Sequence, residues 1–270
     1  MIGGKDLPRR TLSAAILAPT VLALTWYGSW PFALIWALAG IAVVYECGTV
    51  ARLVPRVLPI ATGAAAVLAA SAVLAATGSG AVAIALCGGG AVLAIVTARG
   101  RLWAGGGVLC GAAASLPIVA LRDTDQLGLV AVLFLYAVVW STDVGAYFTG
   151  RAVGGPKLWP RLSPNKTWSG SIGGAICGMF AGIALLLAAG LVFNPVWLVL
   201  GVLLSAVAQA GDLAESAFKR TFGVKDTGSL IPGHGGVLDR LDGFLAAVLL
   251  AGLIGFARND LAPAAGLLLW

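Results

Sequence analysis

The chain has 270 residues, of which 60% are hydrophobic and only 10% are charged. Soluble domains carry about a quarter charged residues, so this composition excludes a soluble enzyme with one anchor and predicts a polytopic membrane protein. The formal net charge of +6 does not indicate nucleic-acid binding, because the sequence has no basic run with interleaved aromatic residues.

Nine apolar stretches, each bounded by charge, Pro or Gly, are candidates for membrane-spanning helices. In chain order they cover approximately residues 11–28, 31–50, 57–77, 80–97, 103–121, 127–148, 170–192, 195–217 and 242–257. The basic N-terminus followed by an apolar run resembles a signal peptide, but an uncleaved helix fits better because the chain that follows is itself apolar. We therefore expect an all-α, polytopic integral membrane protein with about nine transmembrane helices, forming a single membrane domain over residues 1–270.

The basic residues are distributed unevenly among the connections between these stretches. With the N-terminus placed in the cytoplasm, fifteen of the 17 Lys and Arg residues fall in cytoplasmic segments, and only Arg122 and Arg258 fall on the other side. This bias follows the positive-inside rule and predicts a cytoplasmic N-terminus in the cell membrane. Two long cytoplasmic segments remain, at about 149–169 and 218–241, and loops of this kind carry function when a rigid scaffold positions them.

The first long segment contains the run Ser163-Pro164-Asn165-Lys166-Thr167-Trp168. Lys166 offers a point charge to phosphate, and the hydroxyl groups of Ser163 and Thr167 can donate hydrogen bonds. The same residues also suit a helix cap ahead of the stretch that begins at residue 170. Both interpretations remain open on the residues alone.

An acidic helix face is predicted near the cytoplasmic end of the eighth stretch. Asp212, Glu215, Ser216 and Lys219 are three and four residues apart, so they share one face of a helix. Mostly apolar residues precede Asp212 for three turns, and a carboxylate so close to lipid requires a cation, a proton or a basic partner.

Further carboxylates lie at the ends of other apolar stretches. Asp239 and Asp242 stand three residues apart at the entrance to the last stretch, where they also suit the positive end of a helix dipole. With Asp212 they can hold one or two Mg²⁺ ions, which prefer a few carboxylates together with water and phosphate. Asp143 and Glu46 lie at similar depths in two other stretches, where each can pair with a cytoplasmic Arg or Lys.

The stretch from Ser216 to Asp242 concentrates charge in a chain that is otherwise almost entirely apolar. It contains the basic residues Lys219, Arg220, Lys225 and Arg240, the acids Asp226, Asp239 and Asp242, the single histidine His234, and a glycine-rich turn. Such a turn lets backbone N–H groups approach phosphate, and the basic side chains can hold phosphate oxygens. Considered in isolation, the glycine-rich turn is equally typical of a flexible loop, and a single histidine such as His234 is more often structural.

Together these residues resemble the signature of the phosphatidate cytidylyltransferase family, also called CDP-diacylglycerol synthases. The shared pattern is S-x-x-K-R, four residues, K-D, then P-x-H-G-G and D-R-x-D. It matches Ser216, Lys219, Arg220, Lys225, Asp226, Pro232, His234, Gly235, Gly236, Asp239, Arg240 and Asp242. Residues 163–168 are similar to the family's S-P-K-K-T-x-E-G element, although Asn165 and Ser169 depart from it. The motif-bearing catalytic half is expected to span about residues 140–257.

The resemblance implies a Mg²⁺-dependent nucleotidyltransferase that converts CTP and phosphatidic acid to CDP-diacylglycerol and pyrophosphate at the cytoplasmic membrane face. It implies Asp212 and Asp239 as leading metal ligands, joined by Asp242, with a second metal ion left open. It implies catalytic roles for Lys219, Arg220, Lys225, Asp226, His234 and Arg240. It implies substrate binding by Ser163, Asn165, Lys166, Thr167, Ser216, Gly235, Gly236 and Asp143. The expected partners are CTP, phosphatidic acid and membrane lipid, with no nucleic acid and with a homodimer left open.

Two alternatives remain, of which one is a related enzyme and the other belongs to another class of protein. Another CTP-dependent lipid enzyme, such as a polyprenol kinase or a CDP-archaeol-type synthase, remains open because apolar spans do not reveal the acceptor. A transporter or ion channel would use Asp143, Asp212 and Asp242 as a polar path. Transporters of that kind place acids near the bilayer midplane and are built from inverted repeats. Here the acids cluster at one face and no repeat is evident, which favours the enzyme.

Overall fold

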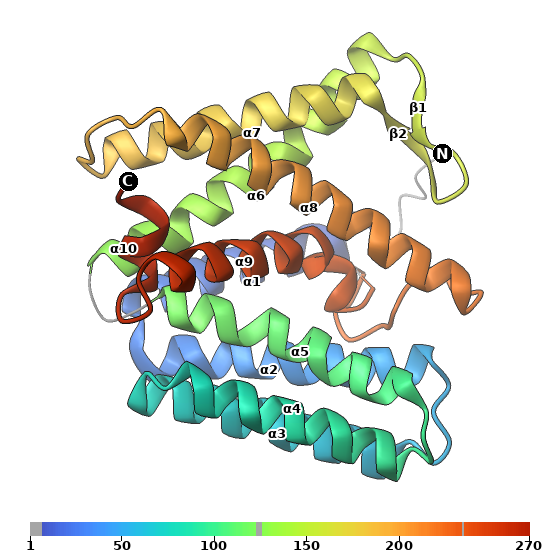
Figure 1. Ribbon diagram of the computed structural model, residues 1–270. Coiled ribbons are helices and arrows are strands. Elements are labelled where there is room, and N and C mark those ends of the chain that lie inside the picture. The colour runs from blue at the N-terminus through green and yellow to red at the C-terminus, as the bar shows by residue number, and fades with distance from the viewer. Residues whose placement is uncertain (1–6, 123–125, 234) are drawn as a thin grey trace. The chain divides into compact units, whose positions relative to one another are not determined.

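The computed structural model describes residues 7–122, 126–233 and 235–270, and this part of the chain is almost entirely helical (Figure 1). The long helices are α1 (Leu7–Tyr27), α2 (Ser29–Val50), α3 (Val57–Thr77), α4 (Gly80–Thr97), α5 (Leu102–Leu121), α6 (Gln126–Val153), α7 (Trp168–Ala188), α8 (Val196–Thr221) and α9 (Leu238–Arg258). Each of them coincides with one of the predicted apolar stretches. A short helix, α10 (Pro263–Leu268), and two short strands, β1 (Lys157–Trp159) and β2 (Ser163–Thr167), complete the elements.

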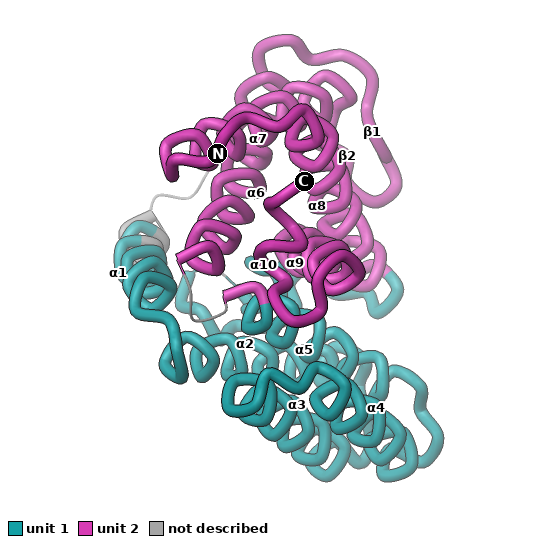
Figure 2. Tube along the Cα trace, turned by 60° about the vertical axis from the view of Figure 1, so that its left-hand side comes forward, with its two compact units in different colours: residues 1–120, 221–241 teal, residues 121–220, 242–270 magenta. Residues whose placement is uncertain are grey.

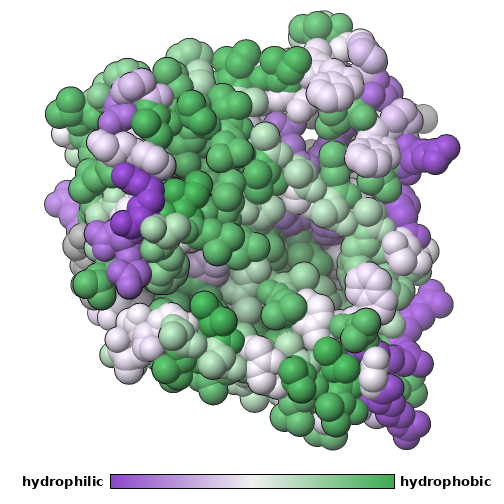
Figure 3. Space-filling view, viewed as in Figure 1, coloured by the Kyte–Doolittle hydropathy of each residue, from purple (hydrophilic) through white to green (hydrophobic). Residues whose placement is uncertain are grey.

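Eight of the long helices, α2 to α9, are long and apolar enough to cross a membrane. The chain is therefore an all-α polytopic integral membrane protein, as predicted. The first of the nine expected spans is the exception, because the apolar part of α1 is the shorter stretch Ala15–Tyr27. Hydrophobic side chains cover most of the face shown in Figure 3, which suits a surface that contacts lipid.

The connection between α6 and α7 differs from the prediction, because it forms a small hairpin. β1 and β2 pair in antiparallel fashion, with Lys157 opposite Thr167 and Trp159 opposite Ser163. The Ser163–Thr167 motif therefore lies on a strand. Thr167 also caps α7, since its Oγ1 accepts the N–H of Gly170 at 3.1 Å. The helix-cap interpretation of Thr167 is thus confirmed.

The chain forms two compact units, each built from two chain segments (Figure 2). Unit 1 contains residues 1–120 and 221–241, and unit 2 contains residues 121–220 and 242–270. The motif-bearing stretch from residue 216 to 242 is consequently divided between the units. Its central part, the 221–241 segment, belongs to unit 1 with helices α1 to α5. The single membrane domain stays a prediction.

Unit 1 is organised around small apolar side chains of α2 to α5. The fully buried members of this core include Val67, Ala70, Ala83, Ala94 and Val108. Arg101 donates from Nη1 to the carbonyl oxygen of Arg52 at 3.1 Å, which joins the α4–α5 and α2–α3 connections at one end of the unit. Trp103 of α5 meets Phe222 edge to face, with ring centroids 5.1 Å apart. This contact anchors the start of the 221–241 segment to the helices of unit 1.

Unit 2 is held together by close contacts between α6, α7 and α8. α7 carries a glycine every four residues along its buried face, at Gly170, Gly174, Gly178 and Gly182. A Cβ on Gly174 would lie 2.6 Å from the carbonyl oxygen of Thr142 in α6, so the two helix backbones approach as small residues allow in membranes. The hydroxyl of Thr142 lies 2.8 Å from that of Ser205 in α8. Asp143 follows Thr142 on α6, so this packing also fixes the position of Asp143 relative to α7 and α8.

Candidate active site

Two helices of unit 2 meet at a pair of glycines beside acidic residues. A Cβ on Gly211 of α8 would lie 2.7 Å from the carbonyl oxygen of Asp242 in α9. A Cβ on Gly243 of α9 would lie 2.8 Å from the carbonyl oxygen of Ala208 in α8. Both contacts are with backbone atoms, so this approach of α8 to α9 requires glycine at both positions. Asp212 follows Gly211 and Asp242 precedes Gly243, and the helix contact therefore brings the two aspartates together.

The carboxylates of Asp212, Glu215 and Asp242 form what we call the acidic cluster. Oxygen atoms from the three groups all lie within 4.8 Å of one another, with Glu215 buried and both aspartates half-buried. Like charges at this separation repel strongly where the dielectric is low, so the cluster favours a cation. Oxygen ligands from a few carboxylates suit a hard divalent ion such as Mg²⁺. The structure thus brings together two of the three predicted metal ligands, Asp212 and Asp242, and places the carboxylate of Glu215 beside them.

Two lysines supply positive charge to the acidic cluster. Lys166 of β2 forms an ion pair with Oδ2 of Asp212. Nζ of Lys219 lies 2.7 Å from Oε2 of Glu215, one turn away on α8. Asp143 of α6 is close enough to interact electrostatically with Asp212 and Lys166. Together with Asp143, the acidic cluster has four carboxylates, and the two lysines supply two ammonium groups. If all are ionised, the formal charge is −2, which one divalent cation would balance.

The other predicted residues of unit 2 surround this arrangement in different ways. Ser163 is half-buried and Asn165 exposed, both on β2, while the hydroxyl of Thr167 is engaged in capping α7. Ser216 is half-buried on α8, beside Glu215 in the sequence, and Arg220 is exposed at the end of that helix. Of the predicted substrate-binding residues, Lys166 and Asp143 are the ones that the structure associates with the acidic cluster.

In unit 1 the 221–241 segment folds around the carboxylate of Asp239. Oδ2 of Asp239 accepts the N–H groups of Thr227 at 2.9 Å and of Gly236 at 2.8 Å. The hydroxyl of Thr227 lies 3.0 Å from the same oxygen. Asp239 stands in the first turn of α9. Its negative charge there suits the positive end of the helix dipole, so the carboxylate also helps to cap α9. Its role as a metal ligand stays a prediction.

The 221–241 segment also meets a carboxylate from a distant part of the sequence. Glu46 of α2 is completely buried. It accepts the N–H groups of Val237 and Leu238, each at 2.8 Å, and the hydroxyl of Thr227 at 3.1 Å. The sequence offered a cytoplasmic Arg or Lys as the partner of Glu46. The partners that the structure gives are neutral donors of the 221–241 segment.

The remaining predicted residues of unit 1 lie along the same segment. Lys225, Asp226 and Arg240 are exposed. Gly235 adopts a φ of 84°, which favours glycine, and its carbonyl oxygen accepts the N–H of Ile231 at 3.0 Å. The N–H of Gly236 is donated to Asp239, as described above. His234 lies outside the described residues.

Comparison with known proteins identifies the family. Residues 8–256 match the sequence model of the cytidylyltransferase family. The chain belongs to this family. It is 43% identical over 274 residues to the phosphatidate cytidylyltransferase of Brucella suis biovar 1 (strain 1330), covering 96% of this chain and 97% of that protein. It is 47% identical over 134 residues to the phosphatidate cytidylyltransferase of Staphylococcus aureus (strain COL), covering 49% and 51% of the two chains.

Membership makes the protein a nucleotidyltransferase, and it confirms the resemblance that the motifs predicted. For this cytidylyltransferase, the sequence did not suggest Glu215 as a candidate metal ligand, although its spacing from Asp212 placed both residues on one helix face. It also missed Thr227, because a lone threonine gives no signal before its partners are known. Glu46 did give a signal, as a single acid within an apolar stretch.

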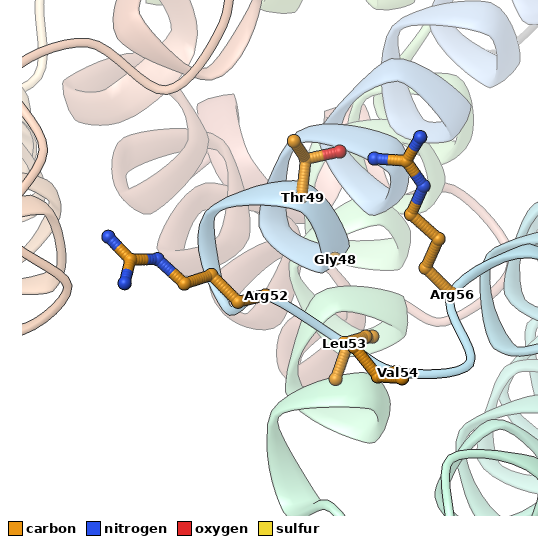
Figure 4. A pocket seen from close by; sticks show the side chains of 6 residues that line it. All are labelled: Gly48, Thr49, Arg52, Leu53, Val54 and Arg56. Carbon is orange, nitrogen blue, oxygen red and sulfur yellow. The ribbon is translucent and has the colours of Figure 1, made fainter.

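A pocket of this cytidylyltransferase lies elsewhere in unit 1, at the turn after α2 (Figure 4). Its volume is about 420 Å³, and it is lined by Gly48, Thr49, Arg52, Leu53, Val54 and Arg56. Arg52 and Arg56 extend in different directions in Figure 4, so their guanidinium groups do not converge on one point. The lining contains no carboxylate and none of the motif residues, which distinguishes this pocket from the candidate active site.

Proposed function

We propose that this cytidylyltransferase joins CTP to phosphatidic acid, giving CDP-diacylglycerol and pyrophosphate. The observation that carries this proposal is the 43% identity, over 96% of the chain, to a phosphatidate cytidylyltransferase. The chemistry of unit 2 supports it, because carboxylates beside lysines suit a polyphosphate substrate and a divalent cation.

The acidic cluster is the proposed metal site. Asp212, Glu215 and Asp242 would hold Mg²⁺, since hard cations take carboxylate oxygens and leave coordination positions for water and phosphate. A bound Mg²⁺ would supply charge neutralisation at the triphosphate and at the departing pyrophosphate. Asp239 is proposed as a further ligand, and a second ion as a further occupant, on the strength of the family motif alone.

The lysines are proposed to bind phosphate. Lys166 and Lys219 lie beside the cluster carboxylates, and their flexible stems allow the ammonium groups to turn toward phosphate oxygens. Arg220, Lys225 and Arg240 are exposed cations of the motif and are proposed to add to this binding. Both substrates are anionic, so the attack of one phosphate on another is opposed by charge. Neutralising that charge and aligning the phosphates is the main catalytic task.

Transfer is proposed to be direct. An oxygen of the lipid phosphate forms a bond to the α-phosphorus of CTP, while the bond from that phosphorus to the bridging oxygen of the β-phosphate breaks. Pyrophosphate leaves with the electron pair. The lipid phosphate is already ionised at neutral pH, so it requires positioning more than deprotonation. A serine nucleophile such as Ser216 would require an activating base.

The reaction is proposed to take place at the cytoplasmic face of the cell membrane. Leaving aside the three basic residues ahead of the apolar part of α1, twelve Lys and Arg residues lie on the side of the motif-bearing segments, and only Arg122 and Arg258 lie on the other side. This bias supports a cytoplasmic location for both motif-bearing segments. CTP then arrives from the cytoplasm, and the lipid enters from the bilayer.

The position of the label in CTP tests the reaction class. Purified protein in detergent receives phosphatidic acid and CTP labelled at either the α- or the γ-phosphorus. We expect the α-label in the lipid product and the γ-label in pyrophosphate. The γ-label in the lipid would instead identify a kinase. A polyprenol and an ether-linked archaeol-type phosphatidic acid serve as competing acceptors, and a preference for either would overturn the substrate assignment while leaving the family intact.

A further inference from the structure

We infer that Glu46 is a positioning residue, which holds the 221–241 segment in the conformation needed for turnover. The inference rests on the proposed function in one respect, namely that this segment acts on the substrates. Glu46 lies on α2, in the first of the two chain segments of unit 1, and its side chain is completely buried. A carboxylate buried within an apolar span is costly without partners, so its partners indicate what it does.

All described partners of Glu46 come from the 221–241 segment. Oε1 accepts the N–H of Val237, and Oε2 accepts the N–H of Leu238, both at 2.8 Å. These two residues stand at the start of α9, where the first N–H groups of a helix have no acceptor within the helix. Glu46 therefore caps α9 from another helix, and its negative charge also suits the positive end of the α9 dipole.

Two glycines allow the backbone to approach this carboxylate. A Cβ on Gly228 would lie 2.9 Å from Oε1 of Glu46, and a Cβ on Gly236 would lie 2.6 Å from Oε2. A Cβ on Gly236 would also overlap Oγ1 of Thr227, so a side chain at either position would disturb the contact between the segment and Glu46. Part of the glycine-rich composition of the motif is thus explained by contact with Glu46, and that part does not depend on phosphate.

Thr227 connects Glu46 to the motif aspartate. Its Oγ1 lies 3.1 Å from Oε2 of Glu46 and 3.0 Å from Oδ2 of Asp239, and its N–H is donated to the same oxygen of Asp239. A hydroxyl carries one proton, so that of Thr227 donates to one carboxylate at a time, while its oxygen stays in contact with both. Glu46 thereby fixes the position of Asp239 through Thr227.

The variant Glu46→Gln tests this role. The amide keeps the shape of the side chain but replaces one acceptor oxygen with a donor, so one of the N–H or O–H groups that faced Glu46 loses its acceptor. We expect faster hydrogen–deuterium exchange at Val237 and Leu238, with the peptides of α2 to α5 unchanged. We also expect kcat/KM for CTP to fall at least about tenfold, in line with the loss of one buried hydrogen bond to a charged group.

Variants of Thr227 separate positioning from general packing. Thr227→Ser keeps the hydroxyl and is expected to keep most activity, whereas Thr227→Val removes the hydroxyl and is expected to lower kcat/KM. The double variant Glu46→Gln with Thr227→Val is expected to lose less than the product of the two single effects, because both changes break the same hydrogen bond. Strictly independent effects would contradict the inference.

Ser115→Ala is the matched control. Ser115 is completely buried in α5 of unit 1, and its hydroxyl bonds to the carbonyl oxygen of Gly111 in its own helix. We expect neither exchange at residues 237–238 nor kcat/KM to change in this variant. Unchanged exchange in Glu46→Gln would overturn the inference, and so would faster exchange with full activity. If the wild-type protein makes no CDP-lipid, the proposed function fails, and the exchange comparison alone then decides the role of Glu46.

Discussion

Replacing Gly211 by alanine tests whether the contact between α8 and α9 sets the geometry of the acidic cluster. The added Cβ would lie 2.7 Å from the carbonyl oxygen of Asp242 and 2.7 Å from Cβ of Ala246. Ordinary van der Waals contact begins at 3.4 Å. The helices must therefore shift by about 0.7 Å at this point, and overpacking of this kind costs about 1–3 kcal/mol of stability.

The same shift moves Asp212 relative to Asp242, because each adjoins the altered contact. A misplacement of about 1 Å can cost about a hundredfold in rate, so we expect Gly211→Ala to slow cytidylyl transfer by about 10- to 100-fold. The concentration of Mg²⁺ that gives half-maximal activity should rise as the carboxylates separate. Changing Ala246 to glycine in the Gly211→Ala background removes one of the two contacts and should restore part of the activity.

The assay is the initial rate of CDP-lipid formation across a range of Mg²⁺ concentrations, with thermal unfolding of the purified protein measured alongside. Gly106→Ala provides the control, since Gly106 is a helical glycine of α5 with open space where a Cβ would stand. We expect this variant to match the wild type in activity and Mg²⁺ dependence and to unfold at no lower a temperature, because alanine is the better helix former. Full activity and an unchanged Mg²⁺ dependence in Gly211→Ala would refute the idea that the α8–α9 contact positions the metal ligands.

Three further predictions concern the carboxylates of Glu215 and Asp239 and the orientation of the chain in the membrane. Glu215→Gln should raise the Mg²⁺ requirement at least about tenfold, as loss of a ligand charge predicts, while Asp260→Asn at an exposed position should not; an unchanged Mg²⁺ titration would remove Glu215 from the ligands. Asp239→Asn should lose most turnover, and near-normal activity at low Mg²⁺ would assign Asp239 to capping α9 alone. A cysteine at Ser229 should react with a membrane-impermeant thiol reagent only after the cytoplasmic face is opened, and one at Val192 should react from outside; the reverse pattern would contradict the proposed orientation.

The helices could be predicted well because their ends are marked in the sequence. The stretch predicted at 57–77 coincides with α3, which begins after Arg56 and ends before Gly78. α6 continues to Val153, beyond the predicted end at residue 148, because Thr149 and Arg151 end the apolar run without ending the helix. The β1–β2 hairpin was missed, because its strands are three and five residues long and lack alternation of apolar and polar residues.

The site could be predicted only in part. Contacts between residues close in the sequence were predictable, whereas contacts between distant residues were not. Glu215 lies three residues from Asp212, so its place beside that carboxylate was accessible from helical spacing. The partners of Glu46 lie 181 to 192 residues away along the chain. No local pattern links α2 to Thr227, because the contact exists only once the helices of unit 1 have packed. The pairing of Lys166 with Asp212, 46 residues apart, is of the same kind.

Product formation by the wild-type protein and by Asp212→Asn, measured side by side, tests most directly whether the acidic cluster supports cytidylyl transfer. Both proteins, matched for folded amount, receive Mg²⁺, phosphatidic acid and CTP labelled at the α-phosphorus. From the wild type we predict CDP-diacylglycerol and pyrophosphate in equal amounts, and no label on the protein when lipid is omitted. From Asp212→Asn we predict nearly complete loss of product. Undiminished product from that variant, or a stable cytidylyl-enzyme in the wild type, would contradict the proposed site and mechanism.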